Sequence, residues 1–185
     1  FQYALNKDAK LAEEYYSLLA EKKKLKRNDS RRKEINDRLS KIRKKIVDIE
    51  KDVVENAEFI ATTISKTIVD KTIYLQNFDV VIFDEASMAY VPQIVFSGGL
   101  AKSHFVCLGD FRQLPAIVQN EDEERLMQDI FEYCGITQAV ENYDGHDWLV
   151  LLDKQWRMHR SISDFVSQYM YGGMLQTAEE IIEDR

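Results

Sequence analysis

The sequence has 185 residues and a mass of 21.6 kDa, and 45% of its residues are hydrophobic, which excludes a disordered segment. It has no apolar run of about 18 residues and no basic-then-apolar N-terminus, which excludes a transmembrane helix, a membrane partner and a visible signal peptide. Its two cysteines, Cys107 and Cys134, form neither a disulfide framework nor a zinc-ligand pattern, so we expect a reducing compartment: the cytoplasm, or the nucleus in a eukaryote.

The charge is divided unevenly along the chain, whose net charge is −7. Residues 1–56 hold 16 Lys and Arg against 11 Asp and Glu, a balance of +5. Residues 57–185 hold the remaining 9 against 21, a balance of −12. This division predicts two modules with different roles, and only the first can offer a broadly basic surface to nucleic acid.

The first module, residues 1–56, is predicted to be a helical arm, because no Gly or Pro occurs between Asn6 and Val54. We expect two antiparallel helices of about 20–26 residues, separated by a polar turn at residues 27–31 with Asp29 or Ser30 as the N-cap. The apolar residues follow the heptad spacing of a coiled-coil hairpin: Leu11, Tyr15, Leu18 and Leu25, then Ile35, Leu39, Ile42, Ile46, Ile49 and Val53. The basic residues of this arm either contact nucleic acid or a protein partner, or only keep a solvated hairpin soluble.

The second module is predicted to be a parallel α/β sheet. Three continuous apolar runs, residues 80–83, 105–108 and 149–152, and a weaker fourth, residues 58–63, lack the polar alternation of half-exposed strands. Such runs are typical of parallel strands that are buried on both faces. Each run ends in polar residues, and the chemistry of open α/β sheets lies at the carboxyl ends of the strands. We therefore expect one site formed from four strand ends.

The clearest local pattern is an apolar strand that ends in two adjacent carboxylates, Asp84 and Glu85. This is the Walker B arrangement of P-loop NTPases. In it, Asp84 would hold Mg²⁺ through water, and Glu85 would orient or deprotonate the attacking water. A strand that simply ends in an acidic turn would give the same pattern.

Two further segments give the chain a family resemblance. Residues 84–87 (Asp-Glu-Ala-Ser), 109–115 (Gly-Asp-Phe-Arg-Gln-Leu-Pro) and 155–159 (Gln-Trp-Arg-Met-His) resemble motifs II, III and IV of superfamily 1 helicases. The resemblance is strongest to the branch containing senataxin, the nonsense-mediated-decay RNA helicase and the Dna2 nuclease-helicases. Residues 61–63 are similar to the Thr-Thr motif of that branch, and residues 169–175 to the segment that follows its motif IV.

The resemblance covers about residues 57–177 and implies a partial RecA-like P-loop NTPase sheet. Residues 1–56 would be a coiled-coil arm inserted in the motor domain. Residues 57–153 would form the C-terminal part of the first RecA-like ATPase domain, and residues 154–185 would carry motif IV and the start of the second.

The resemblance also implies roles for single residues. Gln113 would sense the γ-phosphate of ATP, and Arg157 would reach it as an arginine finger, so both are predicted to be catalytic and to bind ATP. Thr62, Thr63 and Pro115 would contact the backbone of a single nucleic-acid strand without reading its sequence. Two alternatives stay open: Arg157 could form a surface cation–π pair with its neighbour Trp156, and Thr62 and Thr63 could be ordinary strand residues.

Several features depart from the family pattern. Met88 replaces a frequent Gln, and Arg160 replaces the usual Pro. The one segment that ends like a P-loop, residues 96–103, has Phe96 and Ala101 at the two required Gly positions, so we reject it. We therefore expect an internal fragment of a helicase, inactive alone, which binds ATP weakly and pairs with a second copy along an open sheet edge.

We interpret the chain as part of an ATP-dependent DNA or RNA helicase or translocase, a hydrolase that couples ATP hydrolysis to movement on a single strand. Two alternatives remain: the motor of a nuclease-helicase, and a non-catalytic interaction module in which the coiled coil docks a protein onto a decayed NTPase. Backbone contacts do not discriminate DNA from RNA.

Overall fold

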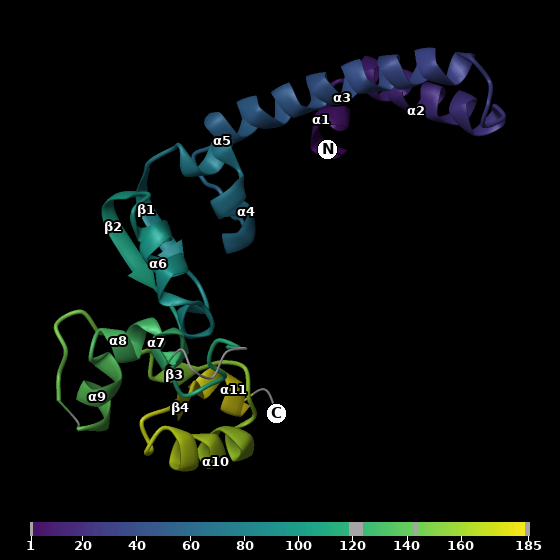
Figure 1. The fold of residues 1–185 in the computed structure, drawn as a ribbon. Helices are drawn as coiled ribbons and strands as arrows, with labels where there is room; N and C mark the ends of the chain where they lie inside the picture. The colour runs from purple at the N-terminus through teal and green to yellow at the C-terminus, as the bar shows by residue number, and fades with distance from the viewer. Residues whose placement is uncertain (1, 119–123, 143, 184–185) are drawn as a thin grey trace. The chain divides into compact units, whose positions relative to one another are not determined.

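The computed structural model describes residues 2–118, 124–142 and 144–183, and the chain divides into two compact units, Phe1–Asn77 and Phe78–Arg185 (Figure 1). Helices are the regular structure of the first unit in its described part, and the second combines short helices with two small sheets. None of the helices that the structure describes combines the length and the hydropathy needed to cross a membrane.

The first unit is built on two antiparallel helices, α2 (Ala9–Lys24) and α3 (Arg31–Glu55), preceded by the short α1 (Gln2–Lys7). Arg38 of α3 pairs with Glu14 of α2 at 2.8 Å, and Arg32 reaches the carbonyl of Leu25 at 2.9 Å, which is the antiparallel order. Most of the predicted heptad residues form the buried core of this unit, and Ala4 and Leu5 of α1 add to it. The heptad residues in this core are Leu11, Tyr15, Leu18, Ile35, Leu39, Ile42 and Ile46. The helical hairpin is therefore present, whereas its coiled-coil character stays a prediction.

The first long helix is shorter than predicted, with 16 residues against 25 in α3. The reason is Asp8, whose side chain accepts the backbone N–H of Leu11 at 3.0 Å and so begins a new helix after α1.

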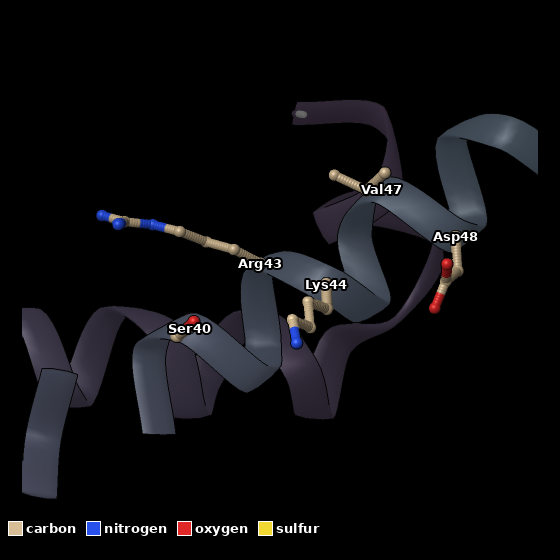
Figure 2. A pocket seen from close by; sticks show the side chains of 5 residues that line it. All are labelled: Ser40, Arg43, Lys44, Val47 and Asp48. Carbon is tan, nitrogen blue, oxygen red and sulfur yellow. The ribbon is translucent and has the colours of Figure 1, made fainter. Parts of the chain in front are cut away.

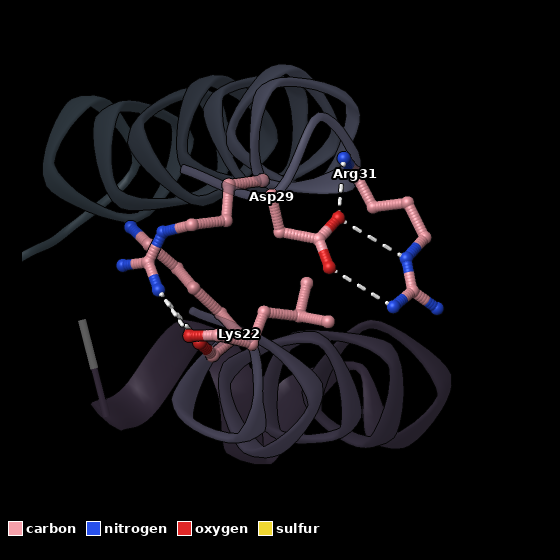
Figure 3. Close-up of polar contacts among 5 residues, drawn as sticks. Lys22, Asp29 and Arg31 are labelled. Carbon is pink, nitrogen blue, oxygen red and sulfur yellow. Dashed lines mark hydrogen bonds and ion pairs between the residues drawn. The ribbon is translucent and has the colours of Figure 1, made fainter. Parts of the chain in front are cut away.

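The turn between α2 and α3 is held by two arginines (Figure 3). Asp29 Oδ1 accepts the backbone N–H of Arg31 at 3.0 Å and its Nε at 3.2 Å, while Asp29 Oδ2 accepts Nη2 at 3.0 Å. Ser30 stands at the N-cap position of α3 but makes no side-chain capping bond, so Asp29 is the residue that stabilises this end. Arg32 Nη1 donates to the carbonyls of Lys22 at 3.2 Å and Leu25 at 2.9 Å, which satisfies carbonyls left free at the end of α2.

The rest of the first unit consists of α4 (Ile64–Val69) and α5 (Lys71–Tyr74). The weak strand predicted over residues 58–63 is wrong, because these residues have no strand structure. Thr63 instead caps α4: its side chain accepts the backbone N–H of Lys66 at 3.3 Å.

The second unit begins with two parallel strands, β1 (Phe78–Phe83) and β2 (Ala101–Cys107), joined by a short 3-10 helix (Ala86–Met88) and by α6 (Val91–Gly98). Phe83 lies opposite Cys107, so the two strands end together. Helix α6 contacts both strands. Three short helices then follow: α7 (Glu124–Met127), α8 (Ile130–Tyr133) and α9 (Ile136–Glu141). The buried core of this unit lies beside the strand ends and consists of Ala86, Ala89, Ile94, Phe131 and Ile136.

The chain ends in a second parallel pair, β3 (Lys154–Gln155) and β4 (Gln176–Thr177), connected by α10 (Arg160–Met170) and followed by α11 (Glu179–Glu183). The strand predicted over residues 149–152 is wrong: these residues form no strand, and Val150 is 82% exposed. They have no strand neighbour among the described residues, and a strand needs one to satisfy its backbone groups. The prediction that the apolar strands are buried on both faces is also wrong, since Val80 and Ile82 of β1 are 50% and 60% exposed.

Candidate functional site

The two predicted carboxylates lie at the carboxyl end of β1, and both are exposed. Asp84 Oδ1 accepts the backbone N–H of Glu85 at 3.0 Å. Glu85 has φ 55° and ψ 43°, the left-handed conformation, and among the described residues it is the one non-glycine residue with positive φ. A residue other than Gly in this region costs about 1–3 kcal/mol and persists only where its surroundings hold it, commonly at functional sites.

The surroundings that hold this turn come from the end of β2. Leu108 donates its backbone N–H to the carbonyl of Phe83 at 2.8 Å, and its own carbonyl accepts the N–H of Ala86 at 2.8 Å. These two bonds bracket Asp84 and Glu85 and join the turn after β1 to the loop after β2. The structure therefore joins two of the four segments that were predicted to be strand ends.

Gly109 is the point of closest approach between these loops. A Cβ at this position would lie 3.0 Å from the backbone N of Ala86, 3.1 Å from that of Ser87 and 3.0 Å from a ring carbon of Phe131. Two of these neighbours are backbone atoms of the turn that carries the carboxylates, so a larger residue would require the two loops to move apart by a few tenths of an ångström.

The loop after β2 presents Gln113 through a compact turn. Asp110 Oδ1 accepts the backbone N–H of Arg112 at 3.0 Å, and Asp110 Oδ2 accepts Gln113 Nε2 at 2.7 Å. The Gln113 side chain is exposed, and its carbonyl oxygen accepts no hydrogen bond from the part of the chain that the structure describes. Gln113 thus offers a fixed acceptor on the loop that adjoins the Asp84–Glu85 turn.

The same loop continues to Pro115, which is exposed. Two residues later the carbonyl of Ile117 accepts the hydroxyl of Tyr90 at 2.5 Å. This bond joins the segment after Pro115 to the segment that follows Ser87. Of these two segments, only the one at Pro115 was predicted to contact a nucleic-acid strand.

Arg157 lies in a second turn, after β3, which is organised by Gln155. Gln155 Oε1 accepts the backbone N–H of Arg157 at 2.9 Å and that of Met158 at 2.7 Å, while its Nε2 donates to the carbonyl of Met158 at 2.9 Å and to Thr177 Oγ1 at 3.1 Å. The Arg157 side chain is exposed and makes no hydrogen bond or ion pair with the described residues. No cation–π contact with Trp156 is found within the same residues.

The site residues fall in both units. Thr62 and Thr63 lie exposed in the first unit, in the segment that leads into α4. Asp84, Glu85, Gln113, Pro115 and Arg157 lie in the second. Within that unit, backbone bonds join the turn of the two carboxylates to the loop of Gln113, whereas no described contact joins Arg157 to either.

Sequence reasoning missed Tyr171, whose hydroxyl donates to Asp110 Oδ2 across 61 positions of sequence. Burial raises the pKa of Tyr171 to about 12, and the Asp110 carboxylate acts in the same direction. The available signal was the pair Gly172–Gly173, both with positive φ, which marks a tight turn directly after this tyrosine.

Of the two carboxylates, Asp84 is suited to bind Mg²⁺ together with water and substrate phosphates. Within the described ranges, no three His, Cys, Asp or Glu side chains gather closely enough to hold a metal by themselves. Mg²⁺, however, usually keeps several waters and binds one or two carboxylates together with substrate phosphates. Asp84 meets that need because it is exposed and its Oδ2 takes no bond from the described residues.

A hollow of about 340 Å³ lies elsewhere, on the surface of α3, lined by Ser40, Arg43, Lys44, Val47 and Asp48 (Figure 2). All five lie on a single helix, and Figure 2 shows the Arg43 side chain extending away from the others. This hollow contains none of the predicted site residues.

Comparison with known proteins assigns the family. A model of the AAA domain family matches residues 2–121, and a second model, also described as an AAA domain, matches residues 131–185. The chain therefore belongs to the AAA domain family, and within it to the superfamily 1 helicase branch that the motifs indicate.

Three relatives illustrate this branch. The chain is 28% identical over 179 residues to the DNA polymerase alpha-associated DNA helicase A of Saccharomyces cerevisiae, covering 89% of this chain and 26% of that protein. It is 28% identical to a regulator of nonsense transcripts 1 homolog of Arabidopsis thaliana (72% and 10%). It is 27% identical to the DNA replication ATP-dependent helicase/nuclease DNA2 of Gallus gallus (78% and 14%). The chain thus spans about a quarter or less of the length of these relatives.

We predict that Gly109→Ala destabilises the second unit by about 1–3 kcal/mol, because the added methyl group lies within 3.0–3.1 Å of backbone atoms that are bonded in the turn and must shift to admit it. Urea unfolding measures the loss. Gly145→Ala is the matched control, since a Cβ there meets nothing within 4 Å, and its effect should stay within about 0.5 kcal/mol. Equal losses in the two variants would show that the close approach at Gly109 is not a constraint.

Proposed function

We propose that this chain is part of an ATP-dependent helicase or translocase that hydrolyses ATP to move along single-stranded DNA or RNA. The observation that carries the proposal is the bonded pair of loops that holds Asp84 and Glu85 beside the loop of Gln113. The family membership and the helicase names of the relatives support it.

The roles of the residues follow from their chemistry. Glu85 is positioned by its turn to orient the attacking water and accept its proton, and the amide oxygen of Gln113 would accept a hydrogen bond from the same water. Asp84 would hold Mg²⁺ through water, and the ion would neutralise charge on the phosphates of the substrate. Arg157, whose exposed side chain pairs with none of the described residues, would stabilise charge that develops in the transition state.

The proposed track is the sugar-phosphate backbone of one strand. Thr62 and Pro115 are exposed, and the Thr63 hydroxyl still has its proton to donate after its oxygen caps α4. Such groups hold a strand without reading its sequence, so these contacts do not discriminate DNA from RNA. A protein of this kind would work in the cytoplasm or the nucleus.

The tip of the helical arm adds an electrostatic contact to this proposal. Residues 22–33 hold eight Lys and Arg and a single carboxylate, Asp29, which is already paired with Arg31. Lys23, Lys24, Lys26 and Arg27 are exposed and donate no side-chain hydrogen bond to the described residues. A dense, unpaired positive surface of this kind favours phosphate backbones, and we propose nucleic acid as the partner of the arm in place of a protein.

We expect ATPase activity of the full-length protein to be strongly stimulated by single-stranded DNA or RNA. Glu85→Gln should lower the stimulated rate by at least about 100-fold, because the amide cannot accept the proton of the water. A steady-state ATPase assay with each polymer measures the stimulated rate and shows whether the protein acts on DNA or on RNA.

The control for that assay is Glu141→Gln, an exposed glutamate at the end of α9, which should leave the rate unchanged. A rate that is independent of nucleic acid and equal in both proteins would contradict the helicase proposal. It would favour the alternative of an interaction module on a decayed NTPase. Nuclease activity in the same protein would identify the nuclease-helicase alternative.

We expect the tip of the arm to contribute to the salt dependence of nucleic-acid binding. Replacing Lys23, Lys24, Lys26 and Arg27 by Gln should reduce the slope of log K against log salt for a single strand by about 2–3. The control, Gln at Lys41, Arg43, Lys44 and Lys45, removes the same charge from the middle of α3. Fluorescence anisotropy across a salt series measures both, and identical slopes would contradict a specific role of the tip.

We also propose that the open sheet edge pairs with a second copy of this chain. Within the described residues, the β1–β2 sheet has two strands and therefore two open edges, and Val80 and Ile82 are half-exposed on β1. Sedimentation of the 185-residue chain should show a dimer. A monodisperse 21.6 kDa monomer would contradict the pairing.

A further inference from the structure

Two side chains share a single oxygen of the Asp110 carboxylate. Gln113 Nε2 donates to Asp110 Oδ2 at 2.7 Å, and the Tyr171 hydroxyl donates to the same oxygen. The other oxygen accepts the backbone N–H of Arg112 at 3.0 Å. Asp110 therefore serves as a three-way acceptor, and its orientation fixes that of the Gln113 amide.

Arg112 makes a second connection between the loop after β2 and the C-terminal end of α10. Its Nη1 donates to the carbonyl of Met170, the last residue of α10, at 2.7 Å. Its guanidinium carbon lies 5.7 Å from the ring centroid of Tyr171 and 5.9 Å from that of Phe111, which are cation–π distances. A cation at the C-terminal end of a helix is also favoured by the helix dipole.

Tyr171 is itself held firmly and remains a donor. Its backbone N–H donates to the carbonyl of Ser167 at 3.0 Å, and its carbonyl accepts the N–H of Met174 at 3.0 Å. Burial raises the pKa of its hydroxyl, which favours the protonated form that donates to Asp110. Ordinary packing of a tyrosine would not require its hydroxyl to meet the carboxylate that holds Gln113.

We propose that Tyr171 is a positioning residue for ATP hydrolysis: through Asp110 it holds the Gln113 side chain in the orientation that the reaction needs. This inference rests on the proposed function and deepens it. Without the hydroxyl, Asp110 loses one of its three partners and Gln113 loses its own interaction with Tyr171, so both side chains can rotate. The Gln113 amide then samples orientations in which its oxygen no longer faces the substrate.

The test compares Tyr171→Phe with Tyr169→Phe in the full-length protein. Tyr169 is 73% exposed, its ring contacts Phe165, and its hydroxyl bonds to none of the residues that the structure describes. We expect Tyr171→Phe to lower kcat of the nucleic-acid-stimulated ATPase about tenfold, with KM for ATP within about twofold. Tyr169→Phe should leave both constants unchanged.

A double-mutant cycle with Gln113→Ala separates positioning from mere structural support. If Tyr171 acts through Gln113, adding Tyr171→Phe to Gln113→Ala lowers kcat no further. Equal tenfold losses in both backgrounds, or an unchanged kcat in Tyr171→Phe alone, would overturn the inference.

Hydrogen exchange of the peptide that covers residues 108–118 gives a readout that does not depend on activity. Tyr171→Phe should increase exchange there while Tyr169→Phe does not, and unchanged exchange would contradict the linkage. If the wild-type protein shows no stimulated ATPase yet Tyr171→Phe still increases exchange, the proposed function fails while the linkage through Asp110 stands.

Discussion

The pair of backbone hydrogen bonds that Leu108 makes with Phe83 and Ala86 is the constraint on which the candidate site depends. Parallel pairing brings the two strand ends level, but pairing alone would leave two independent loops. The bonds of Leu108 lock those loops together, and the absence of a side chain at Gly109 allows the contact. Asp84, Glu85 and the loop of Gln113 become neighbours for this reason, although more than twenty residues separate them in sequence.

The second constraint is conformational and falls on Glu85. A left-handed backbone directs its side chain in a way that an extended residue at a strand end could not match, and the energetic cost is borne by the surrounding bonds. Substitutions that remove the Glu85 carboxylate therefore also differ in how they affect the left-handed backbone. Gly tolerates the conformation at no steric cost, whereas Gln keeps the strain and changes only the chemistry, which makes Gln the cleaner probe of function.

The helices of the arm could be predicted because the seam from Ile35 to Ile46 repeats at heptad spacing and the burial follows it. The beginning of α2 could not, because Asp8 stops one helix and starts another within good helix-forming sequence. Apolar content alone misled the strand predictions: residues 149–152 are as apolar as β1 but have no neighbouring strand among the described residues.

Within the candidate site, Asp84, Glu85 and Gln113 could be singled out from sequence because each follows an apolar strand and matches a motif, and their roles stay predictions. The left-handed turn at Glu85 and the bond from Tyr171 to Asp110 are tertiary features, set by partners 22 and 61 positions away, and no local pattern encodes them. The residue ranges assigned to the two motor domains stay predictions.

The bond between Ala86 and Leu108 also sets an order of events during synthesis. The two carboxylates leave the ribosome well before Leu108, the residue that holds their turn. Until Leu108 emerges and pairs, Glu85 has nothing to maintain a left-handed backbone, and an extended strand end costs less. The two carboxylates thus reach the geometry described here only after the second strand is complete, so a nascent chain that ends between the two strands carries both carboxylates without the turn that orients them.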